Sequence, residues 1–246
     1  MEEAPRPPFR NRILAGLPEE VLERLRPALE PVELKLGQVV AEPNRPIGHV
    51  VFPEEGIVSI VAVMLDGSAV ETATVGSDGM AGLAVFLGAG SMAGEMFVQV
   101  PGHGHRMAAD VLRAEVSGGG VLFDLLGRYA QALFTMLSQS SACNRKHPLD
   151  ARCARWLLLT HDRVDGDAFH LTHLILSQML GVRRATVSEA AGRLQAAGLI
   201  EYSRGRLTIL DRPGLERVSC ECYAIIRSEF ARLVEGVEWP SPLDGA

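Results

Sequence analysis

The stretch from Leu171 to Leu210 constrains the fold more than any other part of the sequence. Thr172 is a predicted N-cap, and the apolar residues that follow recur at helical spacing. Gly181 suits the end of this helix, because glycine adopts positive φ without steric penalty. A second helix is predicted from about Arg184 to Ala197, and a basic hairpin follows with its tip at residues 203–206. Two short helices joined by a glycine turn and followed by a basic hairpin are the pattern of a winged helix-turn-helix.

The predicted second helix presents polar and charged side chains on the outer face of its first turns. A helix fits the major groove of DNA, where an arginine that bonds the O6 and N7 edge of guanine adds about 1–3 kcal/mol of base discrimination. Arginines at a hairpin tip suit phosphate or minor-groove contacts. An arginine-bearing surface helix in an ordinary helical domain is the alternative, but the order of cap, glycine turn and basic hairpin favours double-stranded DNA as the partner. The predicted DNA-binding residues are Arg183, Arg184, Ala185, Thr186, Ser188, Glu189, Arg193, Ser203, Arg204 and Arg206.

The net charge of −6 conceals an uneven distribution of charge along the 246 residues. Residues 1–150 hold 12 Lys and Arg against 18 Asp and Glu, whereas residues 151–212 hold 9 against 6. The tail from residue 213 is acidic again, with 3 against 6. Local charge, rather than total charge, governs attraction to DNA. The only positive segment is the one with the predicted helix-turn-helix, and its small excess predicts modest non-specific affinity and a need for dimerisation.

The composition indicates a globular chain, with 47% hydrophobic and 22% charged residues, long enough for one large or two modest cores. No apolar run reaches the ~18 residues needed to span a bilayer, and the acidic, proline-rich start differs from a signal peptide. The four cysteines form no disulfide framework for a chain of this length. We therefore expect a cytoplasmic protein with no membrane partner.

The N-terminal half changes character from about Val32 to Asp110. Short runs rich in Val, Ile and Thr are separated by glycine-containing turns at the interval typical of an all-β sandwich or barrel. Asp66-Gly67 is a strong hairpin signal. These features predict a jelly-roll-like β-barrel. One short helix is predicted before it, from Pro18 to Leu29.

A long helix is predicted after Gly118-Gly119-Gly120, extending to about Asn144, and Pro148 opens a further helix. The long helix carries apolar residues close to heptad a/d spacing, in a stripe widened by additional leucines. A stripe this broad needs two partners, which are its own barrel and, most simply, a symmetry-related helix. A helix packed wholly inside the protomer is the alternative. The predicted dimerisation residues are Leu122, Leu125, Tyr129, Ala132, Met136 and Cys143.

Barrel, long helix and winged helix in this order resemble the cyclic-AMP receptor/fumarate-nitrate regulator (Crp/Fnr) superfamily, over roughly Leu14 to Ile226. The most specific parts are LSQMLGVRRATVSEAAGRLQAAGLIEYSRGRLTILD, the CECY motif from Cys220 to Tyr223, and the VGSDGMAG motif from Val75 to Gly82. The resemblance implies an α+β chain with a cyclic-nucleotide-binding-like sensor barrel at 1–118, a dimerisation helix at 119–146 and a DNA-binding winged helix-turn-helix domain at 147–246. It implies a homodimeric transcription regulator that is not an enzyme, reads a pseudo-palindromic operator and works with RNA polymerase.

The recognition helix departs from the family at two of three base-reading positions. The family reads bases through an arginine, the glutamate after it and an arginine four residues beyond that glutamate. Arg184 matches the first position, whereas Ala185 and Glu189 stand at the other two. Alanine can contact a thymine methyl and glutamate can accept from a cytosine amino group, so we expect a different operator and not loss of binding. Arg183, Ser188 and Arg193 remain for phosphates.

The sensor barrel lacks the residues by which the family's cyclic-nucleotide binders hold their ligand. Leu83 stands where an acid takes the ribose, and Gly94-Glu95 lies where an arginine takes the cyclic phosphate. A carboxylate there would repel a phosphate. A shifted register that uses Gly94-Glu95 with Arg106 lacks the hydroxyl that follows the arginine in the family. Cyclic AMP is therefore not expected, no cofactor is predicted, and the effector stays unknown.

The cysteines leave a metal or redox role open as an alternative. Cys220 and Cys222 form a C-x-C pair, which Cys143 or Cys153 could complete. A lone C-x-C is a weak metal signal and cysteine is also a common core residue, so no metal ligands are predicted. The family's iron-sulfur sensors carry an N-terminal cysteine cluster, whereas the first cysteine here is Cys143.

Two further classes of function remain as alternatives. His103-Gly104-His105 near Asp110 is similar to the metal-binding pair of cupin enzymes, but no third histidine follows at barrel spacing, and an enzyme is not expected. A sensor or adaptor that has lost DNA binding is the other alternative. It would show no salt-dependent binding to random duplex DNA, whereas a true DNA-binding protein shows a steep negative slope.

Overall fold

The N-terminal half of the computed structural model is an antiparallel sheet preceded by short helices. The structure describes residues 9–203 and 205–237. The leading helices are α1 (Arg12–Ala15), α2 (Glu19–Leu25) and the 3-10 turn η1 (Arg26–Ala28). The strands are β1 (Glu30–Leu34), β2 (Val39–Ala41), β3 (His49–Val63), β4 (Ala69–Val75) and β5 (Glu95–Ala108).

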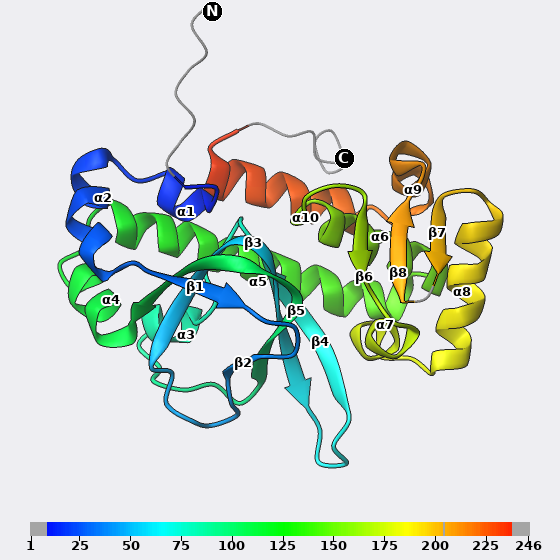
Figure 1. Cartoon of the computed structure of the whole chain (residues 1–246), viewed down its shortest axis with the longest axis horizontal. Coiled ribbons are helices and arrows are strands. Elements are labelled where there is room, and N and C mark those ends of the chain that lie inside the picture. Colours follow the sequence, from blue (N-terminus) through cyan, green and yellow to red (C-terminus); the bar gives the residue numbers. More distant parts are fainter. Residues whose placement is uncertain (1–8, 204, 238–246) are drawn as a thin grey trace, which may run out of the picture.

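The sheet has the order β1-β5-β3-β4, with β2 also paired to β5, and every pairing is antiparallel. The long strands β3 and β5 change register three times between Pro53 and Val58. Such irregularities bend strands and increase their twist, which lets the sheet curl around an apolar interior (Figure 1). The predicted jelly-roll-like fold is confirmed, although the pairings form a curled run of strands and not a closed ring.

Four helical details of this half differ from the prediction. The helix expected from Pro18 to Leu29 ends at Leu25 and continues only as η1, because Pro27 has no N–H to extend the helical ladder. The short helices α1, α3 (Leu83–Phe86) and α4 (Ala109–Val116) were not predicted. They have only 4, 4 and 8 residues, which is too few for a reliable periodic signal.

The long helix is α5 (Val121–Lys146), and it begins after the predicted glycine run. Its apolar stripe lies inside the protomer except at Leu137, against β4 on one side and α10 (Cys222–Phe230) on the other. The predicted dimerisation residues are at most 5% exposed. Their assignment to a dimer contact is therefore wrong, because the protomer's own core already covers them. The corrected residues are Leu122, Leu125, Tyr129, Ala132, Met136 and Cys143.

The C-terminal half is a helical unit with a small sheet at its edge. Its elements are α6 (Leu149–His161), β6 (Ala168–His170), α7 (His173–Leu180), α8 (Arg184–Ala196), β7 (Ile200–Ser203), β8 (Arg206–Ile209), α9 (Arg212–Val218), α10 and the π-helical turn η2 (Ala231–Glu235). Figure 1 shows the small sheet, α7 and α8 at the end of the molecule opposite α2 and α4, whereas α10 and η2 run back toward α1. The predicted helix-turn-helix and hairpin are confirmed. A third antiparallel strand, β6, pairs with β8 and was not predicted.

None of the helices in the part of the chain that the structure describes has the length and apolar character of a membrane span.

The half-buried carboxylate of Glu71 connects the sheet to α6. Glu71 lies on β4 and accepts hydrogen bonds from the Ser59 hydroxyl (2.5 Å) and the Trp156 indole N–H (2.6 Å). Desolvation raises the pKa of Glu71 from its ordinary 4.5 to about 7, although both hydrogen bonds favour the charged form. Because the unfolded chain gives up this proton at lower pH than the folded protein, this group lowers the stability of the fold as pH rises from 4.5 to about 7.

We expect Glu71→Gln to remove this loss, since glutamine keeps the shape and an acceptor oxygen without ionising. The free energy of unfolding of the variant should rise relative to wild type by about 1–3 kcal/mol between pH 4.5 and pH 8, after allowance for solvent screening of a half-buried group. Chemical denaturation at both pH values measures this difference. Glu23→Gln, on the exposed face of α2, is the control and should leave the pH profile unchanged. A pH-independent difference for Glu71→Gln would contradict the assignment.

Candidate nucleic-acid interface

Local hydrogen bonds and packing build the α7–α8 pair. The Thr172 hydroxyl accepts from the backbone N–H of Ile175 (3.1 Å) and caps α7, as predicted. Gly181 ends α7 with φ of 63°, a conformation that carries a steric penalty for residues with a Cβ. The inner face of α8 is buried against the core through Val187, Ala190, Ala191 and Leu194. The outer face of α8 is therefore fixed in orientation.

The helix α8 lies at the edge of the molecule (Figure 1), and the predicted base-reading residues of its outer face are exposed. Arg183, at the N-cap, makes no side-chain capping bond, so the first N–H groups of α8 have no side-chain partner there. Free N–H groups and the helix dipole at such an end favour anions. The exposed residues of this face are Arg183, Arg184, Ala185, Thr186 and Glu189.

The hairpin β7–β8 is held against α7 by an aromatic contact. The rings of Tyr202 and His173 stack with centroids 4.3 Å apart, and the Tyr202 hydroxyl donates to the Leu171 carbonyl (2.7 Å). Ser203 and Arg206 lie exposed beside the hairpin tip, while Arg204 lies outside the described residues. The predicted hairpin arginine that the structure describes is therefore positioned on the same end of the molecule as α8.

Two predicted phosphate contacts are engaged inside the protomer. Arg193 forms two hydrogen bonds with Asp150 of α6 (2.6 and 2.7 Å), and these hold the end of α8 to α6. The Ser188 hydroxyl lies 2.8 Å from the Nδ1 of His173 and 3.0 Å from the Arg184 carbonyl. Burial, and then the charge of Arg184, lowers the pKa of His173, which favours a neutral ring that can accept from Ser188. Both side chains therefore position α8 in this structure, a role that the sequence did not indicate.

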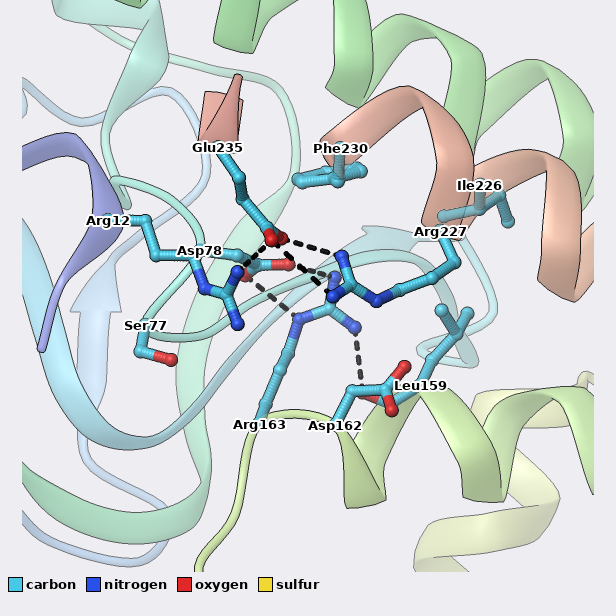
Figure 2. Close-up of a pocket in the computed structure, with 10 residues that line it drawn as sticks. All are labelled: Arg12, Ser77, Asp78, Leu159, Asp162, Arg163, Ile226, Arg227, Phe230 and Glu235. Atoms are coloured by element: carbon cyan, nitrogen blue, oxygen red, sulfur yellow. Dashed lines mark hydrogen bonds and ion pairs between the residues drawn. The ribbon is translucent and has the colours of Figure 1, made fainter. Parts of the chain in front are cut away.

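A buried polar cluster joins the sheet, α6 and α10 (Figure 2). Arg163 follows α6 with a side chain only 3% exposed, and it donates to Asp78 through Nε (3.0 Å) and Nη2 (2.7 Å). Its Nη1 donates to the Leu159 carbonyl (2.7 Å). Beside it, Glu235 accepts from Arg227 (2.6 Å) and from Arg12 of α1. This cluster connects the N-terminal half to the C-terminal helical unit, and it was not predicted.

The cysteines of the C-x-C pair meet Cys143 and a histidine that was not predicted. Cys143 from α5, His147 at its end, Cys220 and Cys222 offer ligand atoms that all lie within 4.8 Å of one another. Cys153, the other predicted partner, lies on α6 and is not a member of this group; burial raises the pKa of its thiol to about 12. The fold thus brings Cys143 to the C-x-C pair, as the metal or redox alternative considered, and adds His147, which the sequence prediction missed.

The positions considered for a cyclic nucleotide or a cupin-type metal have other surroundings. Leu83 lies at the start of α3 and is 9% exposed. Arg106, the arginine of the shifted register, pairs with Glu30 on the neighbouring strand (2.8 Å). His103 and His105 lie within β5, and they face Glu55 and Glu54 (3.4 Å each).

The order of jelly-roll-like sheet, long helix and winged helix-turn-helix is the fold that the resemblance to the Crp/Fnr superfamily implies. Residues 151–218 match the Crp-like helix-turn-helix domain. The chain thus carries a Crp-like helix-turn-helix domain, and the resemblance to the Crp/Fnr regulators is confirmed. No curated protein matches the chain in a sequence search.

Solved structures of this class share the fold over most of both chains. A CRP-family transcriptional regulator from Thermus thermophilus is 18% identical and superposes with a TM-score of 0.64 over 76% of this chain and 96% of its own. The c-di-GMP-responsive global regulator CLP of Xanthomonas campestris is 16% identical, with a TM-score of 0.59 over 78% of this chain and 99% of its own. FixK2 of Bradyrhizobium japonicum is 14% identical, with a TM-score of 0.62 over 78% of this chain and 98% of its own. The Thermus and Xanthomonas proteins are regulators.

Proposed function

We propose that this protein is a cytoplasmic, homodimeric transcription regulator that binds a pseudo-palindromic DNA operator through α8. The observation that carries the proposal is the exposed outer face of α8, with Arg183, Arg184 and Thr186 on a helix whose inner face is fixed by the core. A helix presented in this way suits the major groove. Arg206, Ser203 and, by sequence, Arg204 of the hairpin suit the flanking phosphates or the minor groove. RNA polymerase is the further partner that this function would require.

The exposed side of α5 supports pairing of two protomers. Opposite its buried stripe, α5 exposes Phe134 (63%), Leu137 (38%) and, nearer its start, Phe123 (44%). With Gly127 and Ala130 between them, these residues follow the 3- and 4-residue steps of a coiled-coil seam. The proposed seam is Phe123, Gly127, Ala130, Phe134, Leu137 and Ser141. Two copies related by a twofold axis through it would set their recognition helices one DNA turn apart, about 34 Å.

A signal at the sheet would reach DNA through α5 and the polar cluster around Arg163, which both halves share. Any ligand that favours one packing of these elements shifts the geometry of the two recognition helices. We do not propose cyclic AMP as that ligand. The apolar Leu83 stands at the family's acid position, and Arg106, the arginine of the shifted register, is already paired with Glu30.

The proposed function is tested by DNA binding of the full chain. Fluorescence anisotropy with random duplex at two salt concentrations should give affinity that falls steeply as salt rises, with a slope set by the number of phosphates contacted. Selection from a random duplex pool should then recover a pseudo-palindromic site. Absence of salt-dependent binding would leave the adaptor alternative and contradict the proposal.

Arg184→Ala should weaken binding to the selected site by about 1–3 kcal/mol and relax the preference at one base pair in each half-site, because the arginine is proposed to read a base edge. Anisotropy on the selected site and on single-base variants measures both effects. Arg232→Ala removes an exposed arginine from η2, away from α8, and should change neither the affinity for the selected site nor the base preference. Equal weakening on all duplexes would show that Arg184 contacts only phosphate.

A further inference from the structure

Three thiols and an imidazole converge where the long helix meets the start of α10. Cys143 and His147 stand one helical turn apart at the end of α5, and Cys220 and Cys222 flank the beginning of α10. The Sγ atoms of Cys143 and Cys220 are 3.5 Å apart, and the Sγ of Cys222 is 3.6 Å from the Nδ1 of His147. The four ligand atoms all lie within 4.8 Å of one another. Tetrahedral Zn²⁺, with bonds of about 2.3 Å to sulfur and about 2.0 Å to nitrogen, separates its ligand atoms by about 3.5–3.8 Å.

The second ring nitrogen of His147 has the partner that a metal-bound histidine needs. Its Nε2 lies 3.1 Å from a carboxylate oxygen of Glu221, while Nδ1 faces Cys222. A histidine that ligates a metal usually donates its other N–H to a carboxylate, which fixes the tautomer and the ring orientation. Glu221 is therefore placed as a positioning residue, and it sits between the two cysteines of the C-x-C pair in the sequence.

The surroundings suit a site with net negative charge. The three cysteines are at most 7% exposed, and the His147 side chain is 21% exposed. Two buried arginines from α6, Arg152 and Arg155, interact electrostatically with Cys143, and the Nε of each lacks a hydrogen-bond partner among the described residues. Zn²⁺ with three thiolates and a neutral imidazole carries one net negative charge, which these guanidinium groups would offset.

We infer that Cys143, His147, Cys220 and Cys222 bind one Zn²⁺ ion in a closed tetrahedral site that clamps the end of α5 to the start of α10. On binding, each thiol gives up its proton to solvent and its sulfur bonds the ion. Four protein ligands with no open position are typical of a structural zinc site, not of a catalytic one. An iron-sulfur cluster fits less well, because its ligand sulfurs bind different iron atoms and lie further apart. A Cys143–Cys220 disulfide would leave Cys222 and His147 without a role.

Metal binding by the full-length protein tests this inference independently of DNA binding. The reduced protein is stripped with a chelator and titrated with Co²⁺, whose absorption spectrum reports tetrahedral geometry and thiolate ligation, and then with Zn²⁺. We expect about one ion per protomer, a tetrahedral thiolate spectrum, and displacement of Co²⁺ by Zn²⁺. Absence of stoichiometric binding, or an octahedral spectrum without thiolate bands, overturns the inference. So does mass spectrometry under non-reducing conditions if the freshly purified protein carries a Cys143–Cys220 disulfide.

Variants separate the four ligands from the nearby thiol. Cys222→Ser and His147→Ala should each weaken Zn²⁺ binding at least about 100-fold, and Glu221→Gln about 10–100-fold. Cys153→Ser, at a buried cysteine outside the group, is the matched control and should bind as wild type. His147→Cys restores a fourth ligand and should retain Co²⁺ with a stronger thiolate band, which keeps the test decisive if another variant unfolds. Unchanged binding by His147→Ala, or loss in Cys153→Ser equal to that in Cys222→Ser, contradicts the site.

Discussion

Arg163→Ala should lower the free energy of unfolding by about 3–5 kcal/mol, the effect expected when one partner of a buried ion pair is removed. The substitution leaves the Asp78 carboxylate buried without the two hydrogen bonds that it accepts from the Arg163 guanidinium. It also removes the bond to the Leu159 carbonyl and the contact of the guanidinium with the Phe230 ring, 5.7 Å from its centroid. Chemical denaturation at neutral pH measures the effect.

Arg106→Ala is the matched control for this prediction. Arg106 also pairs with a carboxylate, that of Glu30, but its side chain is 45% exposed, so its removal should change stability by less than about 1 kcal/mol. A double variant, Arg163→Met with Asp78→Asn, removes both charges and should recover part of the loss. If Arg163→Ala is no more destabilising than Arg106→Ala, the cluster does not stabilise the junction between the two halves.

The close packing around Arg163 explains why the glycines of the VGSDGMAG motif are needed. A Cβ on Gly76 would lie 2.6–2.8 Å from the aliphatic stem of Arg163, and a Cβ on Gly79 would lie 2.5 Å from the Tyr129 hydroxyl. The motif was recognised in the sequence by resemblance. Its physical basis became visible only in the fold, because Asp78 and Arg163 are 85 residues apart.

The DNA-binding unit was predictable because its signals are local. The cap at Thr172 acts on an N–H three residues away, and Gly181 acts through its own φ, so a single sequence contains both. The β-rich character of the sheet was predictable for the same reason, since alternation and turn residues lie side by side in the chain. The lengths of β3 (15 residues) and β5 (14 residues) were not, because each continues through residues that were expected to interrupt a strand. The strand β6 escaped prediction, because three residues carry no usable alternation.

The apolar residues of α5 that were predicted to contact another protomer are buried inside their own, because a periodic apolar stripe indicates that a helix face is buried but not which partner covers it. Leu122, Tyr129 and Met136 are covered by the sheet and α10 of their own chain. The proposed exposed seam is less apolar than the buried stripe, with glycine, alanine and serine between its larger residues. Hydrophobic spacing alone therefore favours the buried side of α5.

The group of Cys143, His147, Cys220 and Cys222 was only half visible in the sequence. The C-x-C pair was found, but its contacts with the other two residues are distant in the sequence. Cys220 is 77 residues from Cys143, and Cys222 is 75 residues from His147. Cys143 and His147 stand at the i, i+4 spacing of one helical face, which is the signal that a search for paired ligands could have used.

Phe134→Asp should separate the proposed dimer, weakening self-association by at least about 3 kcal/mol, or about 100-fold. Phe134 is the most exposed apolar side chain on α5, and a twofold axis along the seam would place two aspartates against each other in an apolar contact. Sedimentation velocity across a concentration series measures the change, and affinity for the full operator should fall by a similar factor, because each half-site would then bind alone.

Leu65→Asp provides the control for Phe134→Asp. Leu65 is a fully exposed apolar residue in the turn between β3 and β4, so the same introduction of charge should leave both self-association and operator affinity unchanged. A circular dichroism melt would show that Phe134→Asp retains the wild-type fold, as expected for an exposed position. A Phe134→Asp variant that sediments as the wild-type dimer would place the twofold contact elsewhere. A wild-type protein that stays monomeric on its operator would contradict paired recognition altogether.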